Sequence, residues 1–221
     1  MLLSGGLDSA TAMAYANSKG FECHAISFNY GQRHRSELAC AKKIARHLGA
    51  KDHVIIKFDL RKWGGSALTS DNIKVPKIRT GKGIPPTYVP ARNTIFLSFA
   101  VSYSETIGAK DIFIGVNSLD YSGYPDCRPK FIKSFEKTAN LGTRAADEEW
   151  KFKIHTPLQT LKKSEIIRLG LSLGLDYSIT QSCYDPGENG VICGKCDSCT
   201  IRKKGFAEAG IPDPVIRKRK I

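Results

Sequence analysis

The chain alternates between two patterns of hydrophobic and polar residues. Short apolar runs bounded by polar clusters predict strands, and they cover residues 23–30, 53–58, 111–117 and 151–157. Between them, apolar residues recur every three or four positions, which is the spacing of amphipathic helices. The expected helices cover residues 9–19, 35–48, 91–107, 130–142 and 162–173. Residues 61–88 show neither pattern and are expected to form a long loop, which in a compact domain is usually functional or mobile.

Strand and helix follow one another through most of the chain, and this order predicts an α/β fold. The expected architecture is a doubly wound, mainly parallel sheet with helices on both faces. Ligands of such sheets bind beyond the carboxyl ends of the strands. The polar segments that follow expected strands should meet there: SGGLDS (4–9), NYGQRH (29–34) and SLDYSGYPDCRP (118–129). Only three residues precede SGGLDS, so its strand is expected to be shorter than the usual ~5–6 residues.

The composition is that of a globular protein with one substantial core. Of the 221 residues, 41% are hydrophobic and 25% are charged. No apolar run approaches the roughly 20 residues of a membrane span, and the first residues lack the features of a signal peptide. We therefore expect a cytoplasmic protein, in which the seven cysteines do not form a disulfide framework.

The net charge of +13 is concentrated in two segments. Residues 61–87 carry six basic and one acidic side chain, and residues 201–221 carry seven basic and two acidic ones, so each segment contributes +5. Charge runs of this kind are usually solvated surface. The alternative is attraction of polyanions, either nucleotide phosphates or RNA.

The segment SGGLDS has the composition of a phosphate-binding loop. Glycines let backbone N–H groups turn toward an anion, and the helix expected to begin near Ser9 adds the positive end of its dipole. Ser4 and Ser9 can donate hydroxyl hydrogen bonds, whereas Asp8 is suited to Mg²⁺. The lysine of the GxxxxGK[ST] loop is missing, so the ordinary nucleotide-loop motif is not matched.

Four of the seven cysteines form a C-x9-C-x2-C-x2-C cluster. Four thiolates suit tetrahedral Zn²⁺, and such a fully occupied site would be structural. Iron–sulfur ligation is the competing interpretation, but the run lacks the fourth cysteine of the ferredoxin spacing. Zinc is therefore favoured, with the expected ligands Cys183, Cys193, Cys196 and Cys199.

These motifs together carry a resemblance to a known family. SGGLDS resembles the loop of PP-loop ATP pyrophosphatases, in which the β- and γ-phosphates leave as pyrophosphate. The chain also resembles the 7-cyano-7-deazaguanine synthase (QueC) family over essentially its whole length. The segments that carry this resemblance occur in one order, and they are FNYGQRH (28–34), GGSALT (64–69), GIPPTYVPARN (83–93), GVNSLDYSGYPDCRPKF (115–131), HTPLQTLKKSEI (155–166) and the cysteine cluster. The resemblance implies a PP-loop ATP-binding and catalytic domain at 1–180. Residues 181–221 would form a cysteine-rich zinc module with a basic tail.

The resemblance also implies a reaction and its participants. The family adenylates 7-carboxy-7-deazaguanine with ATP and magnesium, forms an amide with ammonia, and adenylates that amide to eliminate a nitrile. The resemblance further implies a homodimer that acts on small molecules and needs neither a membrane nor nucleic acid. The residues implied for ATP phosphates and magnesium are Leu3, Ser4, Gly5, Gly6, Leu7, Asp8, Ser9 and Arg92. Those implied for the deazaguanine are Asp120, Tyr121, Tyr124, Asp126 and Arg128.

Two side chains are expected to take part in catalysis. Asp8 would hold Mg²⁺, and Lys163, which matches the lysine of the family it resembles, would neutralise phosphate charge in the transition state. The neighbouring Lys162 leaves the position of that lysine open by one residue. Two other functions compete with this one, a tRNA-modifying PP-loop enzyme and a zinc-ribbon protein that binds RNA without catalysis. The second leaves SGGLDS and residues 115–131 unexplained.

Overall fold

The computed structural model describes residues 1–32, 36–70, 72–77, 83–119, 124–187 and 190–217. Two parallel strand pairs form its sheet. Strand β1 (His24–Asn29) pairs with β2 (Asp52–Lys57), and β3 (Asp111–Phe113) pairs with β4 (Lys153–His155). The expected α/β class with parallel strands is therefore confirmed.

The first three residues join the two strand pairs. The Leu3 N–H donates to the Ile26 carbonyl at 2.9 Å, and the Leu2 N–H donates to the Phe113 carbonyl at 3.0 Å. These residues lie where a central strand belongs, but only Leu2 forms a ladder contact, an isolated parallel bridge to Ile26. The order across the sheet is thus β2, β1, residues 1–3, β3, β4.

The two faces of the sheet contact different sets of helices. Leu2, Ile26 and Ile112 belong to one buried cluster, and their neighbours Leu3, Ala25 and Phe113 belong to another, as the alternation of side chains along strands requires. Helices α3 (Arg92–Thr106) and α4 (Pro129–Leu141) contribute to the first cluster. Those of the second cluster are α1 (Leu7–Ser18), α2 (Ser36–His47), α6 (Lys163–Ser172) and α7 (Asp197–Ala209), and α7 also contributes Cys199 to the first cluster.

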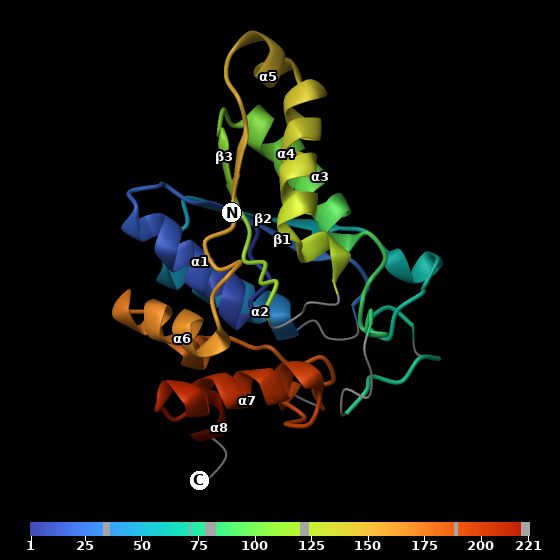
Figure 1. The fold of residues 1–221 in the computed structure, drawn as a ribbon, viewed down its shortest axis with the longest axis vertical. Helices are drawn as coiled ribbons and strands as arrows, with labels where there is room; N and C mark the ends of the chain where they lie inside the picture. The colour runs from blue at the N-terminus through green and yellow to red at the C-terminus, as the bar shows by residue number, and fades with distance from the viewer. Residues whose placement is uncertain (33–35, 71, 78–82, 120–123, 188–189, 218–221) are drawn as a thin grey trace.

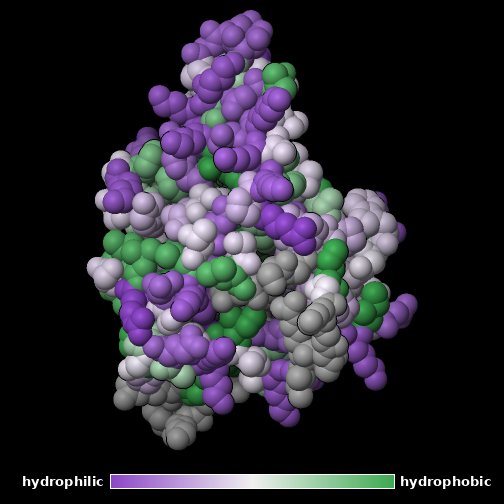
Figure 2. Space-filling model, viewed as in Figure 1, coloured by the Kyte–Doolittle hydropathy of each residue, from purple (hydrophilic) through white to green (hydrophobic). Residues whose placement is uncertain are grey.

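Short elements complete the fold. Helix α5 (Arg144–Glu148) follows α4 at one end of the molecule, and α8 (Pro214–Arg217) follows α7 at the other (Figure 1). Hydrophilic side chains cover the end formed by α4 and α5 (Figure 2). The 3₁₀ turns are η1 (Leu60–Lys62), η2 (Pro125–Cys127) and η3 (Tyr177–Ile179). No helix in the described part of the chain is long and apolar enough to cross a membrane.

The structure shortens two expected strands. Regular pairing ends at Phe113 and His155 rather than at residues 117 and 157. Beyond β3 the chain runs close to the start of α1, where a Cβ at Gly115 would lie 2.9 Å from the backbone of Asp8. Because only glycine permits this approach, the residues after β3 can pass directly against the start of α1.

Candidate active site

The segment from Ser4 to Ser9 forms a tight turn that is held by its own hydroxyl groups. The Ser9 Oγ accepts the Ser4 N–H at 3.2 Å, lies 3.0 Å from the Ser4 Oγ and donates to the Gly6 carbonyl at 3.1 Å. Gly5 has a φ of +90°, and a Cβ there would lie 2.1 Å from the Glu37 carbonyl oxygen. The turn can therefore pack against α2 only with glycine at this position.

The C-terminal part of the chain closes the other side of the turn. The Gln181 N–H donates to the Gly5 carbonyl at 3.0 Å, and the Leu7 N–H donates to the Ser182 Oγ at 3.4 Å. Helix α1 starts at Leu7, two residues earlier than expected, with Gly6 as its N-cap and no side-chain cap. The positive end of this helix thus faces the site, which favours an anion there.

Asp8 and Lys163 form an ion pair at the mouth of the turn. The Lys163 Nζ lies 2.5 Å from the Asp8 Oδ1, although 155 positions separate the two residues. Lys163 is buried at the first position of α6, whereas Lys162 is exposed as its N-cap. Of the two candidate lysines, the structure therefore brings Lys163 to the loop.

The stem of Lys163 lies directly against helix α7. A Cβ added to Gly205 would be 2.3 Å from the Lys163 Cγ and 2.9 Å from its Cβ. Helix α7 also carries Ser198, which lines a cavity beside the phosphate loop. The cysteine-rich segment and the phosphate loop thus share one site.

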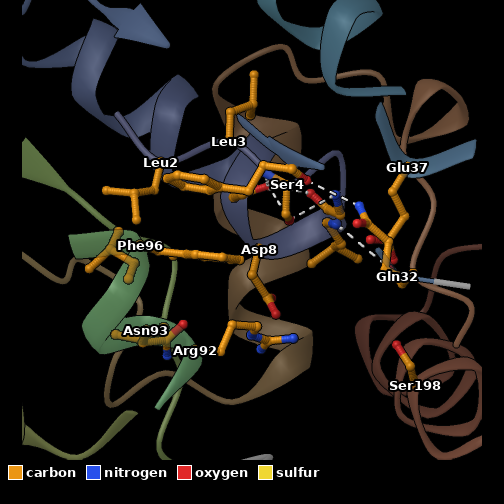
Figure 3. Close-up of a pocket in the computed structure, with 18 of the residues that line it drawn as sticks. Leu2, Leu3, Ser4, Asp8, Gln32, Glu37, Arg92, Asn93, Phe96 and Ser198 are labelled. Carbon is orange, nitrogen blue, oxygen red and sulfur yellow. Dashed lines mark hydrogen bonds between the residues drawn. The ribbon is translucent and has the colours of Figure 1, made fainter. Parts of the chain in front are cut away.

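A cavity of about 210 Å³ opens beside the loop. Its wall includes six of the seven loop residues expected to bind ATP (Leu3, Ser4, Gly6, Leu7, Asp8 and Ser9), while Gly5 lies behind them against α2. Arg92, the first residue of α3, lies on the opposite wall, and the Asp8 side chain points toward it (Figure 3). Phe28 and Phe96 stack at a centroid distance of 4.0 Å and form an apolar side.

The residues expected to bind the base do not all lie in the wall of this cavity. Tyr124 lies in the cavity wall and its hydroxyl is 2.8 Å from the Thr87 Oγ1. Asp126 is buried next to the wall and its Oδ2 accepts the Asn93 N–H at 3.0 Å, so it holds the start of α3. Arg128 is exposed at the N-cap of α4, outside the wall. Asp120 and Tyr121 lie outside the described residues.

Sequence reasoning missed Glu37, which the cavity wall includes. Glu37 is partly buried in the first turn of α2. Burial raises the pKa of its carboxyl to about 7, although the nearby Arg92 guanidinium acts in the opposite direction. The only signal in the sequence was its place just after a polar segment that follows a strand.

The four clustered cysteines converge as their spacing predicted. One ligand atom from each of Cys183, Cys193, Cys196 and Cys199 lies within 4.8 Å of the others, and all four are free thiols. A tetrahedral zinc with Zn–S bonds of about 2.3 Å needs sulfurs about 3.8 Å apart, so the group has the composition and size of a metal site. Backbone N–H groups also donate to these sulfurs, as in Cys193 N to Cys183 Sγ at 3.2 Å. The cluster could therefore bind a metal ion.

The fold and the site define a class of protein. A parallel α/β sheet with a lysine-free SGGLDS turn at a helix N-terminus marks a PP-loop enzyme that uses ATP. Solved structures with this fold include an NMN synthetase from Francisella tularensis, with a TM-score of 0.53 and 18% identity over 96% of this chain and 76% of that one. A 4-thiouridine synthetase in complex with RNA and ATP has a TM-score of 0.50 and 19% identity, over 95% of this chain and 49% of that one.

Comparison with protein families is more specific. The model of the queuosine biosynthesis protein QueC matches residues 1–210, and the chain belongs to this family. It is 64% identical to a 7-cyano-7-deazaguanine synthase of Citrifermentans bemidjiense, over 97% of this chain and 95% of that protein. It is 58% identical to the enzyme of the same name from Legionella pneumophila, over 97% of this chain and 94% of that protein.

Proposed function

We propose that the protein converts 7-carboxy-7-deazaguanine and ammonia into 7-cyano-7-deazaguanine at the expense of two ATP molecules. In the first half, the substrate carboxylate attacks the α-phosphate, pyrophosphate leaves, and ammonia then displaces AMP to give the amide. In the second half, the amide oxygen is adenylated and AMP is eliminated with a proton, which leaves the nitrile. Family membership together with the Asp8–Lys163 pair at the phosphate loop carries this proposal.

The phosphate-loop residues would bind the pyrophosphate part of ATP. Backbone N–H groups at the start of α1 and the hydroxyls of Ser4 and Ser9 supply donors for phosphate oxygens. The Asp8 carboxylate is a suitable ligand for Mg²⁺, which would neutralise charge on the leaving pyrophosphate. Lys163 would then exchange its contact with Asp8 for a phosphate oxygen, which would bring its charge to the point where negative charge develops.

Arg92 and Tyr124 are the described residues best placed for the acid substrate. Both lie in the cavity wall, and an arginine can bind a carboxylate with two parallel hydrogen bonds. Asp126 would act by holding the start of α3, and with it Arg92, through its bond to Asn93. The assignment of Asp120, Tyr121 and Arg128 to the deazaguanine base rests on the family resemblance.

Zinc is the metal we assign to the four cysteines. Four thiolates fill a tetrahedral zinc shell, so the ion would have no open position and would act structurally. Helix α7 begins at this cluster, with Cys196 as its N-cap and Cys199 in its first turn. Metal binding would therefore order the helix against which Lys163 packs.

The remaining proposals concern the assembly and the location of the enzyme. We propose a cytoplasmic homodimer that needs neither a membrane nor nucleic acid, which the family resemblance supports. Light scattering of the purified protein tests the homodimer, because a monomeric mass would contradict it.

One assay tests the reaction directly. Purified protein is supplied with ATP, magnesium, the deazaguanine acid and ammonium, and products are followed by mass spectrometry. We expect two AMP and two pyrophosphate for each nitrile formed. The tRNA-modifying alternative is not favoured by the family assignment, and it predicts turnover only when tRNA is added.

A further inference from the structure

A second, smaller cavity of about 40 Å³ adjoins the main one. Five of the residues that line it also line the main cavity, so the two are neighbours (Tyr30, Gln32, Glu37, Arg92 and Tyr184). A cavity needs a volume of roughly 10–15 Å³ to hold one water molecule. This cavity therefore accepts a molecule about as small as water, but not a phosphate group or a base. Ammonia and ammonium have the required size.

Among the described residues that line the small cavity, Glu37 carries the one carboxylate. Gln32 lies beside Glu37 (Figure 3), and both atoms of its amide already have a partner: its Oε1 accepts the Tyr30 N–H at 2.9 Å, and its Nε2 donates to the Phe28 carbonyl at 3.1 Å. Among the described hydrogen bonds and ion pairs, none involves the Glu37 carboxylate. This carboxylate therefore has the capacity to receive an N–H donor, and it is the charged acceptor among the described residues of this wall.

The position of Glu37 is fixed relative to the phosphate loop. Its own carbonyl packs on Gly5, at a distance that excludes any side chain there. A molecule held at the Glu37 carboxylate would thus share its cavity wall with Arg92, which would hold the substrate carboxylate. It would also lie next to the main cavity, whose wall contains the phosphate loop, so an attacking nitrogen could enter the site from there.

We propose that this small cavity is the ammonium subsite and that Glu37 accepts a proton from ammonium to release ammonia for attack on the acyl adenylate. The inference rests on the proposed function. Ammonium carries two more protons than the amide nitrogen: Glu37 takes the first before attack, and the second leaves for solvent. As the new C–N bond forms, the bond from carbon to the oxygen of AMP breaks and AMP takes that electron pair.

The surroundings of Glu37 suit a proton acceptor that works near neutral pH. Burial raises the pKa of Glu37 to about 7, and Arg92 from the start of α3 partly offsets this effect. The other titratable groups that line the cavity in the described part of the chain are Tyr30, Cys183 and Tyr184, and burial raises the pKa of Tyr30, which keeps it a neutral phenol. The ionised form of Glu37 accepts the proton, so its contribution is expected above pH 7 and is lost as pH falls through this value.

The test compares Glu37→Gln with the wild-type enzyme in two partial reactions. Exchange of pyrophosphate into ATP, driven by the acid without ammonium, reports adenylation alone and should be retained. Amide formation from ammonium should fall by about 10²-fold or more at pH 8, as expected for loss of a general base. With hydroxylamine, which is neutral at pH 7 and needs no such base, the loss should be less than about tenfold. Glu22→Gln, at an exposed carboxylate that pairs with Lys51, is the matched control and should behave like the wild type.

Each contrary result has a distinct meaning. If the wild-type enzyme shows no acid-dependent exchange, the proposed function itself is wrong. If exchange is normal and the Glu37→Gln variant uses ammonium as well as the wild type, the ammonium subsite is refuted. An equal loss with ammonium and hydroxylamine would also refute it, because Glu37 would then act on the acyl adenylate. Loss of exchange in the variant alone would place Glu37 in the ATP or acid site.

Discussion

Replacing Gly205 with alanine should slow the reaction by displacing Lys163. The new Cβ would lie 2.3 Å from the Lys163 Cγ, 2.9 Å from its Cβ and 3.0 Å from the Ile167 Cδ1. Carbon atoms in ordinary contact are ~3.5–4.0 Å apart, so the base of the lysine stem or α7 must move by more than ~1 Å. The contacts are with the base of the side chain, which leaves little room for adjustment by rotation alone.

The expected effect on stability is smaller than the effect on rate. Overpacking a core position costs about 1–3 kcal/mol, but alanine is favoured over glycine in a helix interior by about 1 kcal/mol. The net loss should therefore be about 0–2 kcal/mol, or at most ~8 °C in melting temperature for a chain of this size. A misplacement of a catalytic group by 1 Å can cost about 10²-fold in rate, and this is the loss expected in kcat.

The assay measures pyrophosphate release with saturating acid, ammonium and ATP, together with melting temperature and zinc content. Ala207→Gly serves as control, because it lies on the exposed side of α7 and should destabilise the helix by about 1 kcal/mol without contacting Lys163. Its kcat should stay normal. If Gly205→Ala keeps a wild-type kcat while folded and metal-loaded, Lys163 is not positioned by α7 and the reasoning fails.

Three further predictions follow from the site. Asp8→Ala should abolish AMP formation in a protein with normal circular dichroism, because it removes the carboxylate assigned to Mg²⁺; near-normal turnover would exclude that role. Cys196→Ser should lower bound zinc from about one per chain to well below it and lower the melting temperature. Finding iron and sulfide in anaerobically purified protein would instead overturn the zinc assignment. Asp126→Ala should cost about 1–3 kcal/mol in urea unfolding, since the Asn93 N–H loses its buried acceptor, and an unchanged midpoint would contradict this role.

Local patterns in the sequence determined the elements and the two motifs. Apolar spacing located most helices and strands to within a few residues, because the face that a helix or strand buries repeats along its own segment. The SGGLDS turn and the cysteine cluster were also visible, since their residues lie close together in sequence and their chemistry depends on spacing. The helix at Asp197–Ala209 was not expected, because its apolar residues do not form a clear face.

The tertiary structure decided which distant residues share the site. Packing of α6 and α7 selects Lys163 over its neighbour, sets its stem against Gly205 and brings it to Asp8. The close contact of α2 with Gly5 places Glu37 in the cavity, and the fold makes the Asp126 carboxylate the buried acceptor for the Asn93 N–H. Such pairings depend on how helices pack across the sheet. The spacing of residues along the chain does not indicate that packing, so only the folded structure reveals which distant residues come together.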